Sequence, residues 1–247
     1  MLNFGTGAFY VQRTDLANQG VGRLAVLQET SWNFDYDEKE LTGTGQFPLM
    51  VARGAAKWKG KAKSGTFSAN IYNALFFGQT VTPGGTSAVV NEQHVVPSTA
   101  PYTITVAGSA TFAADLGVSY SGDLNAPMSL VQVAPVAAAT YEQAAGTYTF
   151  SAADAGLPVW VSYTQTSTTG QTINLTNQIL GTTPTFSGSF AGRDPRNGFQ
   201  LFMKLNKLTS SKMSFGSKTS DFAMGDFDIT IMDDGTGNIG SLYLMGA

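Results

Sequence analysis

The sequence WNFDYD at residues 32–37, together with KWKGKAK at residues 57–63, decides the class of fold. In the first stretch aromatic and polar residues alternate, which places Trp32, Phe34 and Tyr36 on one face of an extended strand. In the second stretch every other residue is a lysine, so four ammonium groups share one face. A period of two residues is typical of β-strands. Both stretches therefore predict a protein built mainly from β-sheet.

Further runs of β-branched and aromatic residues have the same period, and they predict strands at 102–106, 147–150, 159–163, 201–205, 226–232 and 241–244. One segment has helical spacing instead, because apolar residues recur every three or four positions over residues 67–77 and Gly78 follows as a stop. We therefore predict a mainly β fold, an antiparallel β-barrel or β-sandwich with one flanking α-helix and long loops.

The composition is poor in charge. Only 13% of the 247 residues are charged and the formal net charge is -3, whereas an average soluble domain has about 25% charged residues. No lysine or arginine lies between Ser64 and Gly192, a stretch that contains five acids. Proteins that read nucleic-acid sequence need clustered lysine and arginine to displace counterions. The charge distribution therefore argues against that class.

The residue counts exclude several kinds of site. Without cysteine there is no disulfide framework, thiolate metal site or cysteine nucleophile, and a single histidine, His94, excludes a multi-histidine zinc site. Residues 1–5 lack the basic and apolar regions of a signal peptide, and the weakly polar stretch 128–139 is too short to span a bilayer. We expect a soluble protein made in a cytoplasm, with no membrane partner.

Two motifs resemble sites but have simpler interpretations. Residues 235–240 match G-x-G-x-x-G, yet only seven residues follow Gly240, which leaves no room for the helix that binds a dinucleotide. We interpret this segment as a glycine-rich turn. His94 would have to serve any Ser-His-Asp system, but it lies between β-branched pairs with no nucleophile motif nearby. We interpret it as a surface or edge-strand histidine.

Two groups of acids, at residues 35–40 and 226–228, could in principle form a glycosidase pair or a site for a hard metal ion. Alternate acids on a strand point the same way and are usually solvated, which is our interpretation of Asp35, Asp37, Glu38, Glu40, Asp226 and Asp228. The sequence Asn174-Leu175-Thr176 matches a glycosylation acceptor, but without a secretory signal it means little. We predict no catalytic residue, no cofactor site and no metal site, and hence no enzyme.

The lysine stripe, defined as Lys57, Lys59, Lys61 and Lys63, has three interpretations. It is a solvated strand face that discourages edge pairing, a contact with acids of a neighbouring subunit, or a groove for nucleic acid. Only one aromatic residue, Trp58, lies within the stripe, and it points the other way. The sequence leaves the three open.

Several segments resemble the tail tube (major tail) proteins of long-tailed bacteriophages. Residues 40–48 and 51–54, followed by the strand at 57–63, look like the N-terminal third of those proteins, and residues 69–78 resemble their helix. Later segments are similar as well: 115–118, 146–156, 162–164 and 176–184. The resemblance covers most of residues 29–232 as short pieces rather than as one diagnostic motif.

The resemblance implies a mechanism. Subunits of this family form rings, commonly of six, whose inner strands close into a barrel around a channel. The rings stack along a tape measure protein into a tube that carries DNA during ejection. Implied partners are the chain itself, the tape measure, tail terminator and baseplate or tail-tip proteins, and DNA in passage. The implied location is the virion tail, assembled in the cytoplasm of a bacterial host.

Two alternative functions remain at this point. One is the tube of a type VI secretion or other contractile injection system, which shares the ring fold. The other is a decoration or adhesive β-sandwich that binds carbohydrate, which exposed Trp58 and Trp160 in a groove beside acids would favour.

For the domain organisation we expect an N-terminal arm at 1–25, ordered only in the assembled tube, and a single tube-like domain at 26–247. Within the domain we expect a long loop at 81–101 and strands at 102–163 that belong to the barrel or to an inserted β subdomain. We also expect acids and neutral polar residues of 64–192 to line part of the channel, or at least to lie away from surfaces that grip DNA, because phosphate would find no cation there.

Overall fold

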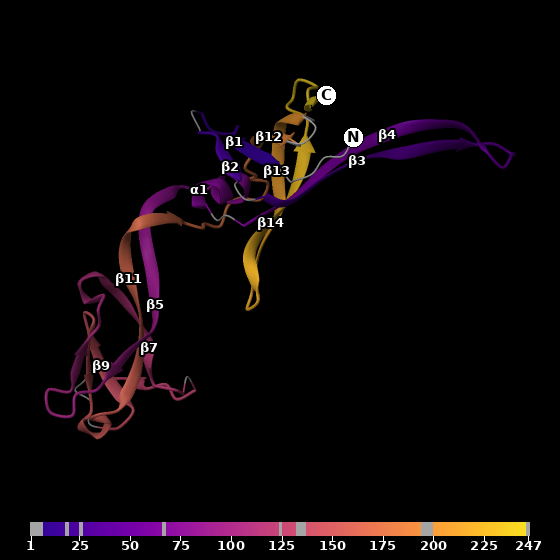
Figure 1. Cartoon of the computed structure of the whole chain (residues 1–247). Coiled ribbons are helices and arrows are strands. Elements are labelled where there is room, and N and C mark those ends of the chain that lie inside the picture. Colours follow the sequence, from indigo (N-terminus) through magenta and orange to yellow (C-terminus); the bar gives the residue numbers. More distant parts are fainter. Residues whose placement is uncertain are drawn as a thin grey trace. The chain divides into compact units, whose positions relative to one another are not determined.

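The computed structural model describes residues 7–17, 20–24, 27–65, 68–123, 125–131, 137–193 and 200–245. The chain folds into two compact units (Figure 1). Unit 1 comprises Met1–Val81 and Ile173–Ala247, and unit 2 comprises Thr82–Thr172. The fold is mainly β with antiparallel sheets, as predicted.

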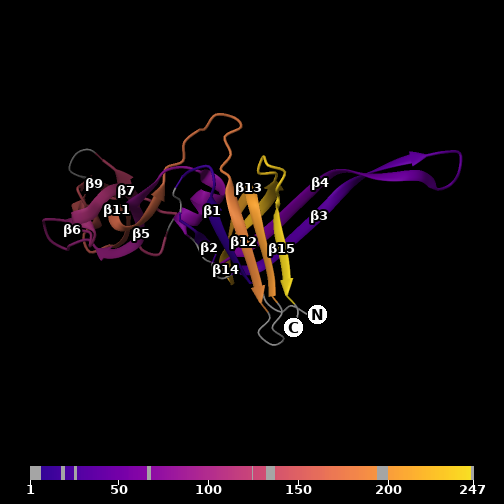
Figure 2. The ribbon, with the colours of Figure 1, turned by 90° about the horizontal axis from the view of Figure 1, so that it is seen from above.

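Unit 1 is an antiparallel sheet of eight strands (Figure 2). The strands pair in the order β2-β1-β12-β13-β14-β4-β3, and β15 pairs with β13 beside this path. Their bounds are β1 Ala8–Arg13, β2 Gly22–Leu24, β3 Leu27–Thr42, β4 Pro48–Ser64, β12 Phe186–Arg193, β13 Gln200–Lys218, β14 Asp221–Met232 and β15 Gly240–Met245. The strands predicted at 32–37, 57–63, 201–205, 226–232 and 241–244 lie within β3, β4, β13, β14 and β15.

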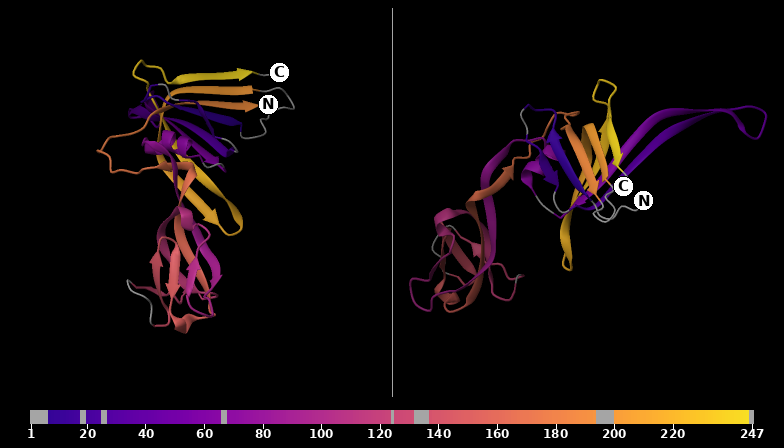
Figure 3. Two further views of the ribbon diagram at one scale, coloured as in Figure 1. Left: turned by 90° about the vertical axis from the view of Figure 1, so that its left-hand side faces the viewer. Right: turned by 45° about the horizontal axis from the view of Figure 1, so that its top comes forward.

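The long strand β13 divides this sheet into two layers (Figure 3). Its first half, 200–208, pairs with β12 and β15, and its second half, 207–218, pairs with β14. The layers meet across a core, where the ring centroid of Trp32 lies 5.8 Å from that of Phe9 and 6.3 Å from that of Phe190. The sandwich form of the prediction is confirmed. The barrel form is not, since the described sheet ends at β2, β3 and β15.

The register between β3 and β4 explains the alternation in the sequence. Trp32 lies opposite Gly60 and Thr30 opposite Ala62, on the face that covers the core, whereas the lysine stripe lies on the other face. A Cβ atom at Gly60 would lie 2.4 Å from the Trp32 ring. Glycine is therefore required there, because the indole occupies the space that any side chain would need.

The predicted helix is present but shorter and less regular than expected. An α-helix, α1 (Ala69–Tyr72), continues as a π-helical turn over Asn73–Phe77, and residues 66–67 lie outside the described residues. The turn ends at Gly78, whose φ of 64° is left-handed and suits glycine. Leu75 and Tyr72 are buried in the core of unit 1. No helix in the described part of the chain has both the length and the apolar character needed to cross a bilayer.

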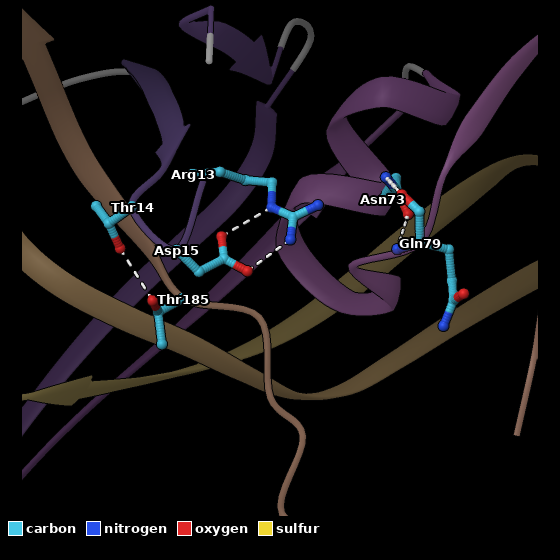
Figure 4. Close-up of polar contacts among 6 residues, drawn as sticks. All are labelled: Arg13, Thr14, Asp15, Asn73, Gln79 and Thr185. Atoms are coloured by element: carbon cyan, nitrogen blue, oxygen red, sulfur yellow. Dashed lines mark hydrogen bonds and ion pairs between the residues drawn. The ribbon is translucent and has the colours of Figure 1, made fainter. Parts of the chain in front are cut away.

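The N-terminal segment is part of the sheet in this single chain. Strand β1 pairs with both β12 and β2, and Phe9 is fully buried. The hydroxyls of Thr14 and Thr185 lie 3.0 Å apart, and the backbone N–H of Thr14 donates to the Thr185 carbonyl (Figure 4). The expected arm at 1–25 is thus corrected for 8–13 and 22–24, because an alternation of buried residues along β1 anchors it to the core. Residues 1–6 of the expected arm lie outside the described residues.

Unit 2 is a second, smaller sandwich. One sheet has the order β5-β11-β7 and the other has the order β6-β10-β9-β8. The bounds are β5 Val81–Val95, β6 Thr103–Thr105, β7 Phe112–Tyr120, β8 Ser129–Leu130, β9 Thr140–Ala144, β10 Thr147–Phe150 and β11 Pro158–Ile173. A separate hydrophobic core lies between the two sheets, and both contribute side chains to it, Val161 and Val118 from one and Tyr148 and Ile104 from the other.

Two expectations about this region change. The long loop expected at 81–101 is largely strand β5, which pairs with β11. Residues 102–163 belong to a unit with its own core, and that unit also includes β5 and the rest of β11 as far as Thr172. The proline, glycine and serine content of 81–101 suggested a loop because such residues are rare in strands. Pairing with a long partner strand overrides that preference.

Unit 2 contains no lysine or arginine, and its buried carboxylates accept hydrogen bonds from tyrosine hydroxyls instead of pairing with cations. Asp115 accepts hydrogen bonds from the hydroxyls of Tyr141 (2.6 Å) and Tyr148 (2.9 Å), both of which are buried in the core. Asp154, which is fully buried, accepts from the hydroxyl of Tyr120 at 2.7 Å and from a backbone N–H. Buried carboxylates need such donors, since an unpaired charge in the interior is costly.

A third carboxylate follows the same rule, since Glu92 accepts from the hydroxyl of Tyr163 (2.7 Å) and the backbone N–H of Ala107 (2.9 Å). Three of the five acids in the cation-free stretch therefore accept hydrogen bonds from tyrosine hydroxyls. For Glu92, Asp115 and Asp154 the expected role of lining a channel is corrected. Residues 82–172 of the cation-free stretch form unit 2, and the rest of the stretch belongs to unit 1.

The tyrosines of unit 2 make a prediction for alkaline solution. Burial, and then the hydrogen bond to Asp115, raises the pKa of Tyr141 and of Tyr148 above the usual value near 10. A raised folded-state pKa gives stability that is complete below about pH 10 and is lost at higher pH, because the unfolded chain ionises first. We expect tyrosinate absorbance to rise in a cooperative step that coincides with unfolding of unit 2, and Tyr148→Phe to reduce the step. A gradual titration of these tyrosines in folded protein would contradict this.

Candidate assembly surfaces

The most prominent feature of unit 1 is a two-stranded arm, defined as residues 33–57 of the β3–β4 hairpin (Figures 1 and 3). Beyond Trp32 every residue of β3 is exposed, so the arm has no core of its own. Its tip carries large apolar side chains, including Phe47, which is 84% exposed; the others are Leu41, Leu49, Met50 and Val51. An isolated two-stranded hairpin is marginally stable in water. An apolar tip on such a hairpin indicates a contact with another molecule.

The two faces of the arm differ in chemistry. One face carries an aromatic row in which the Phe34 ring lies 4.8 Å from the Tyr36 ring and 5.3 Å from the Trp58 ring. The guanidinium of Arg53 lies 4.7 Å from the centre of the Tyr36 ring, a cation–π contact. This aromatic row follows directly from Trp32, which belongs to the core. The apolar face of the sheet therefore continues along the arm without a covering layer.

The opposite face of the arm and sheet is charged, and two of its lysines are paired with acids. Lys63 Nζ lies 2.7 Å from a Glu29 carboxylate oxygen, and Lys57 Nζ lies 3.1 Å from one of Asp37. The remaining acids of the first group, Asp35, Glu38 and Glu40, are exposed on the arm. Such surface pairs contribute little stability, about 0 to 1 kcal/mol.

Acids of β14 complete this pattern. By register Lys63 lies opposite Asp226, and Lys61 lies opposite Asp228, which Lys212 of β13 also faces; Lys59 lies opposite Asn33 and Thr230. Carboxylates beside the lysine stripe lower the positive potential that a polyphosphate requires. This arrangement favours the solvated face and the subunit contact over the nucleic-acid groove.

Strand β15 forms an open edge at the end of the chain. It pairs with residues 200–205 of β13, and its six residues are all exposed. Four of them are large and apolar: Leu242, Tyr243, Leu244 and Met245. Proteins usually protect exposed apolar edge strands because such edges pair with other chains. The edge therefore has the character of an assembly surface.

The loop between Ile173 and Phe186 adds a further apolar projection. Leu180 is 99% exposed and Ile179 is nearly as exposed, at a turn closed by a hydrogen bond from the Thr182 N–H to the Ile179 carbonyl. Thr176, in the glycosylation-like sequence, donates its hydroxyl to the Gln79 side chain at 2.9 Å. Apolar side chains exposed at a loop tip suit a contact with another subunit better than contact with water.

A groove of about 690 Å³ lies between strands β1 and β2 and the helix. The charged side chain among its described lining residues is Arg13, which is buried and donates twice to Asp15, from Nε at 2.9 Å and from a terminal nitrogen at 2.5 Å (Figure 4). This hydrogen bond lowers the pKa of Asp15. Near the groove, Asn73 and Gln79 are joined by two hydrogen bonds (2.6 and 2.8 Å) that involve the Asn73 amide. These polar groups therefore bond to one another in two pairs, Arg13 with Asp15 and Asn73 with Gln79.

The residues singled out for chemistry do not come together. His94 Nε2 lies 2.7 Å from a carboxylate oxygen of Glu92, and among the described residues no serine or threonine hydroxyl bonds to the histidine. Asp226 and Asp228 face lysines across the sheet. In the described part of the chain no three histidine or acidic residues are grouped as metal ligands. Carboxylates bound to lysines or tyrosines are structural groups rather than paired acids of a hydrolase.

The glycine-rich motif is a turn. Strand β14 ends at Met232, and the loop that follows is closed by Asp233, which accepts from the N–H groups of Gly235 (2.7 Å) and Gly237 (3.1 Å). Strand β15 follows from Gly240, so the motif opens a strand and not a helix. A dinucleotide site needs a helix N-terminus at this point.

The tryptophans do not form a sugar-binding platform. Trp58 is half-buried and its ring packs edge-on against Phe34. Trp160 is half-buried within unit 2, and its indole N–H is buried without a hydrogen-bond partner. Neither ring is presented in the way that the carbohydrate-binding alternative requires.

No protein-family model and no curated protein sequence matches this chain. The aromatic row, the open apolar edge and the exposed tips of the arm and loop remain as candidate contact surfaces. Sequence reasoning missed β15 as a candidate surface of this kind. The apolar run at 242–245 was present in the sequence. A strand that is apolar on both faces is expected to be covered on both faces, however, so the run did not predict an exposed edge.

Proposed function

We propose that this chain is a structural subunit that assembles with copies of itself into rings, and that the rings stack into a phage tail tube through which DNA passes. The observation that carries the proposal is the open apolar edge of β15 combined with the uncovered arm. A single chain leaves both in water, and copies of the chain cover them. The resemblance of residues 29–232 to tail tube proteins supplies the kind of assembly.

The geometry suits open-ended assembly. The edges β15 and β3 are different strands, so a contact between them is heterologous and repeats from copy to copy. Such a contact closes into a ring when its rotation allows, and stacked rings need a second contact along the axis. The arm tip and the loop tip at Ile179 and Leu180 are candidates for this second contact.

Among the described residues, the side chains considered for catalysis or metal binding do not come together, which is consistent with a structural role. Lys57 and Lys63 are paired with carboxylates, Asp115, Asp154 and Glu92 accept from tyrosine hydroxyls, and the lysine stripe is flanked by acids. A conduit for DNA needs a wall that does not hold phosphate, because each phosphate–lysine contact strengthens binding and slows sliding.

Electron microscopy of the purified chain in negative stain, across a concentration series, tests this proposal. We expect rings or tubes to appear above a critical concentration, because heterologous contacts of low individual affinity become populated together. Light scattering on the same samples should rise at that concentration. A chain that stays monomeric at high concentration, even when preformed tail-tip complexes are added as initiators, would contradict the proposed function.

A further inference from the structure

Unit 1 has two long strands with an open side. Strand β15 pairs with β13, and no other described strand pairs with it. Strand β3 pairs with β4 and is the last strand of the sheet at the other end. The third edge, β2, has three residues and is too short to match the six of β15. Among the edge strands of unit 1, β3 is thus the one long enough to pair with β15.

The apolar face of β15 continues the core of its own layer. Leu242 lies opposite Met203, which is buried, and Leu244 lies opposite Leu201. Leu242 and Leu244 are themselves 57% and 60% exposed. Since side chains alternate along a strand, Ser241 and Tyr243 lie on the other face, opposite Lys204 and Phe202. The core-facing side of this layer therefore extends beyond its covered strands by one exposed strand, β15.

The arm part of β3 has the same asymmetry. Phe34 and Tyr36 follow Trp32 on the core-facing side, and they are 46% and 40% exposed. Asn33 and Asp35 lie on the other face, opposite Lys59 and Lys57. The order of faces holds from Trp32 to Tyr36, because the register is regular there and shifts only between Tyr36 and Glu38.

We propose that β15 of one copy pairs with residues 33–36 of β3 of a second copy, so that Leu242 and Leu244 share a face with Phe34 and Tyr36. The proposal rests on the proposed function and names its subunit contact. Both strands lack a neighbour on one side, and both expose apolar side chains on the face that continues a core. A slip of one residue would place leucines beside Asp35, and such a slip is disfavoured because it moves every side chain to the wrong face.

The pairing joins the layer of one subunit that contains β15 to the layer of the next subunit that contains β3. The core-facing sides of the two layers then form one continuous apolar surface, which covers the aromatic row. Each copy uses its β15 once and its β3 once, so every added copy offers the same two edges again. Backbone hydrogen bonds give the contact its strength, and the alternation of faces fixes its register.

Disulfide trapping between single-cysteine variants tests the pairing, and because the chain has no native cysteine only the introduced thiols can form disulfides. One set of variants is on β15 (Leu242→Cys, Leu244→Cys and Tyr243→Cys), and the other is on β3 (Phe34→Cys, Tyr36→Cys, Asn33→Cys and Asp35→Cys). Pairs of variants are mixed, oxidised under conditions in which wild-type chains assemble, and separated without reducing agent. Circular dichroism of each variant shows whether it is folded.

We expect covalent dimers from same-face mixtures, at least tenfold more than from opposite-face mixtures. Same-face mixtures combine Leu242→Cys or Leu244→Cys with Phe34→Cys or Tyr36→Cys, and Tyr243→Cys with Asn33→Cys or Asp35→Cys. The matched control combines Leu242→Cys with Asp35→Cys, because directly paired residues approach closely only on one face. Two independent same-face sets keep the test valid if one variant fails to fold.

The outcomes separate this inference from the proposed function. Rings or tubes without any same-face disulfide would overturn the pairing and leave the tube function standing. Same-face disulfides without rings or tubes would support the pairing and overturn the tube. Equal yields from same-face and opposite-face mixtures would show random collision and overturn the pairing. No disulfide and no assembly would overturn both.

Discussion

Replacing Asp115 with alanine is expected to destabilise unit 2 by about 3 to 5 kcal/mol. Asp115 accepts from the hydroxyls of Tyr141 and Tyr148 and from the backbone N–H of Gly117 at 3.0 Å. The two tyrosines are 2% and 0% exposed. Alanine leaves both hydroxyls in the core without an acceptor, and each such group costs about 1 to 3 kcal/mol.

The measurement is denaturant unfolding of the full chain followed by the fluorescence of Trp160, which is the tryptophan of unit 2. Replacing Trp32 and Trp58 with phenylalanine removes the signal from unit 1. Asp115→Asn keeps an acceptor oxygen and should cost less than half as much. Asp123→Ala removes an exposed acid of the same unit and should change stability by less than about 0.5 kcal/mol. Equal effects of Asp115→Ala and Asp123→Ala would refute the structural role of the carboxylate.

Replacing Phe47 and Leu49 together with glutamate is expected to abolish assembly and to leave the monomer folded. Both side chains project from the arm tip and are 84% and 74% exposed, so their loss removes little of the packing within one chain. In an interface, large apolar anchors contribute about 2 kcal/mol or more each. Loss of both anchors, about 4 kcal/mol together, raises the critical concentration for assembly about 1,000-fold.

Sedimentation of assembled material across a concentration series measures this effect, and thermal unfolding of dilute monomer is the control. Val90→Glu changes an exposed apolar residue of unit 2 (67% exposed) in the same chemical way and should leave assembly unchanged. Assembly of the double variant at the wild-type concentration would remove the arm tip from the list of contacts. A large fall in monomer stability would show that the tip has a partner within its own chain.

The stability of unit 2 also depends on pH in acid, through Glu92. Burial opposes its ionisation, but hydrogen bonds from Ala107, Tyr163 and His94 together lower its pKa. A depressed folded-state pKa gives stability that is present above about pH 4.5 and is lost as pH falls through the folded value. Together with the tyrosines, this confines the full stability of unit 2 to the range between mild acid and about pH 10.

Much of the local structure could be predicted from the sequence, and particular residues show why. The alternation in 32–37 and 57–63 fixed the two faces of β3 and β4, because a strand has no freedom to place alternate side chains elsewhere. The helix at 67–77 was found by its spacing, but its π-helical second half was not. That turn depends on a hydrogen bond from the Gly78 N–H to the Asn73 carbonyl, five residues back, which no apolar pattern encodes.

The division of the chain into two units could not be predicted in the same way. Residues 82–101 have the composition of a loop, and their pairing with β11 joins segments about seventy residues apart in sequence. Likewise, the cation-free stretch suggested a channel wall, whereas the tyrosine partners of Asp115, Asp154 and Glu92 come from distant strands. The sequence contains both the acids and the tyrosines, but it does not show which of them lie close together in the folded chain.

The sequence by itself determined the β class of this protein, the faces of its strands and the absence of cysteine chemistry and of a multi-histidine metal site, because these follow from local period and composition. Only the tertiary structure decided which apolar residues are covered. Phe9 and Phe34 are both aromatic residues on alternating strands, yet one is fully buried and the other is nearly half exposed. Burial depends on what packs above a strand, and that is set by the order of strands in space. For this reason the arm and the edge of β15 became visible as candidate assembly surfaces only in the folded chain.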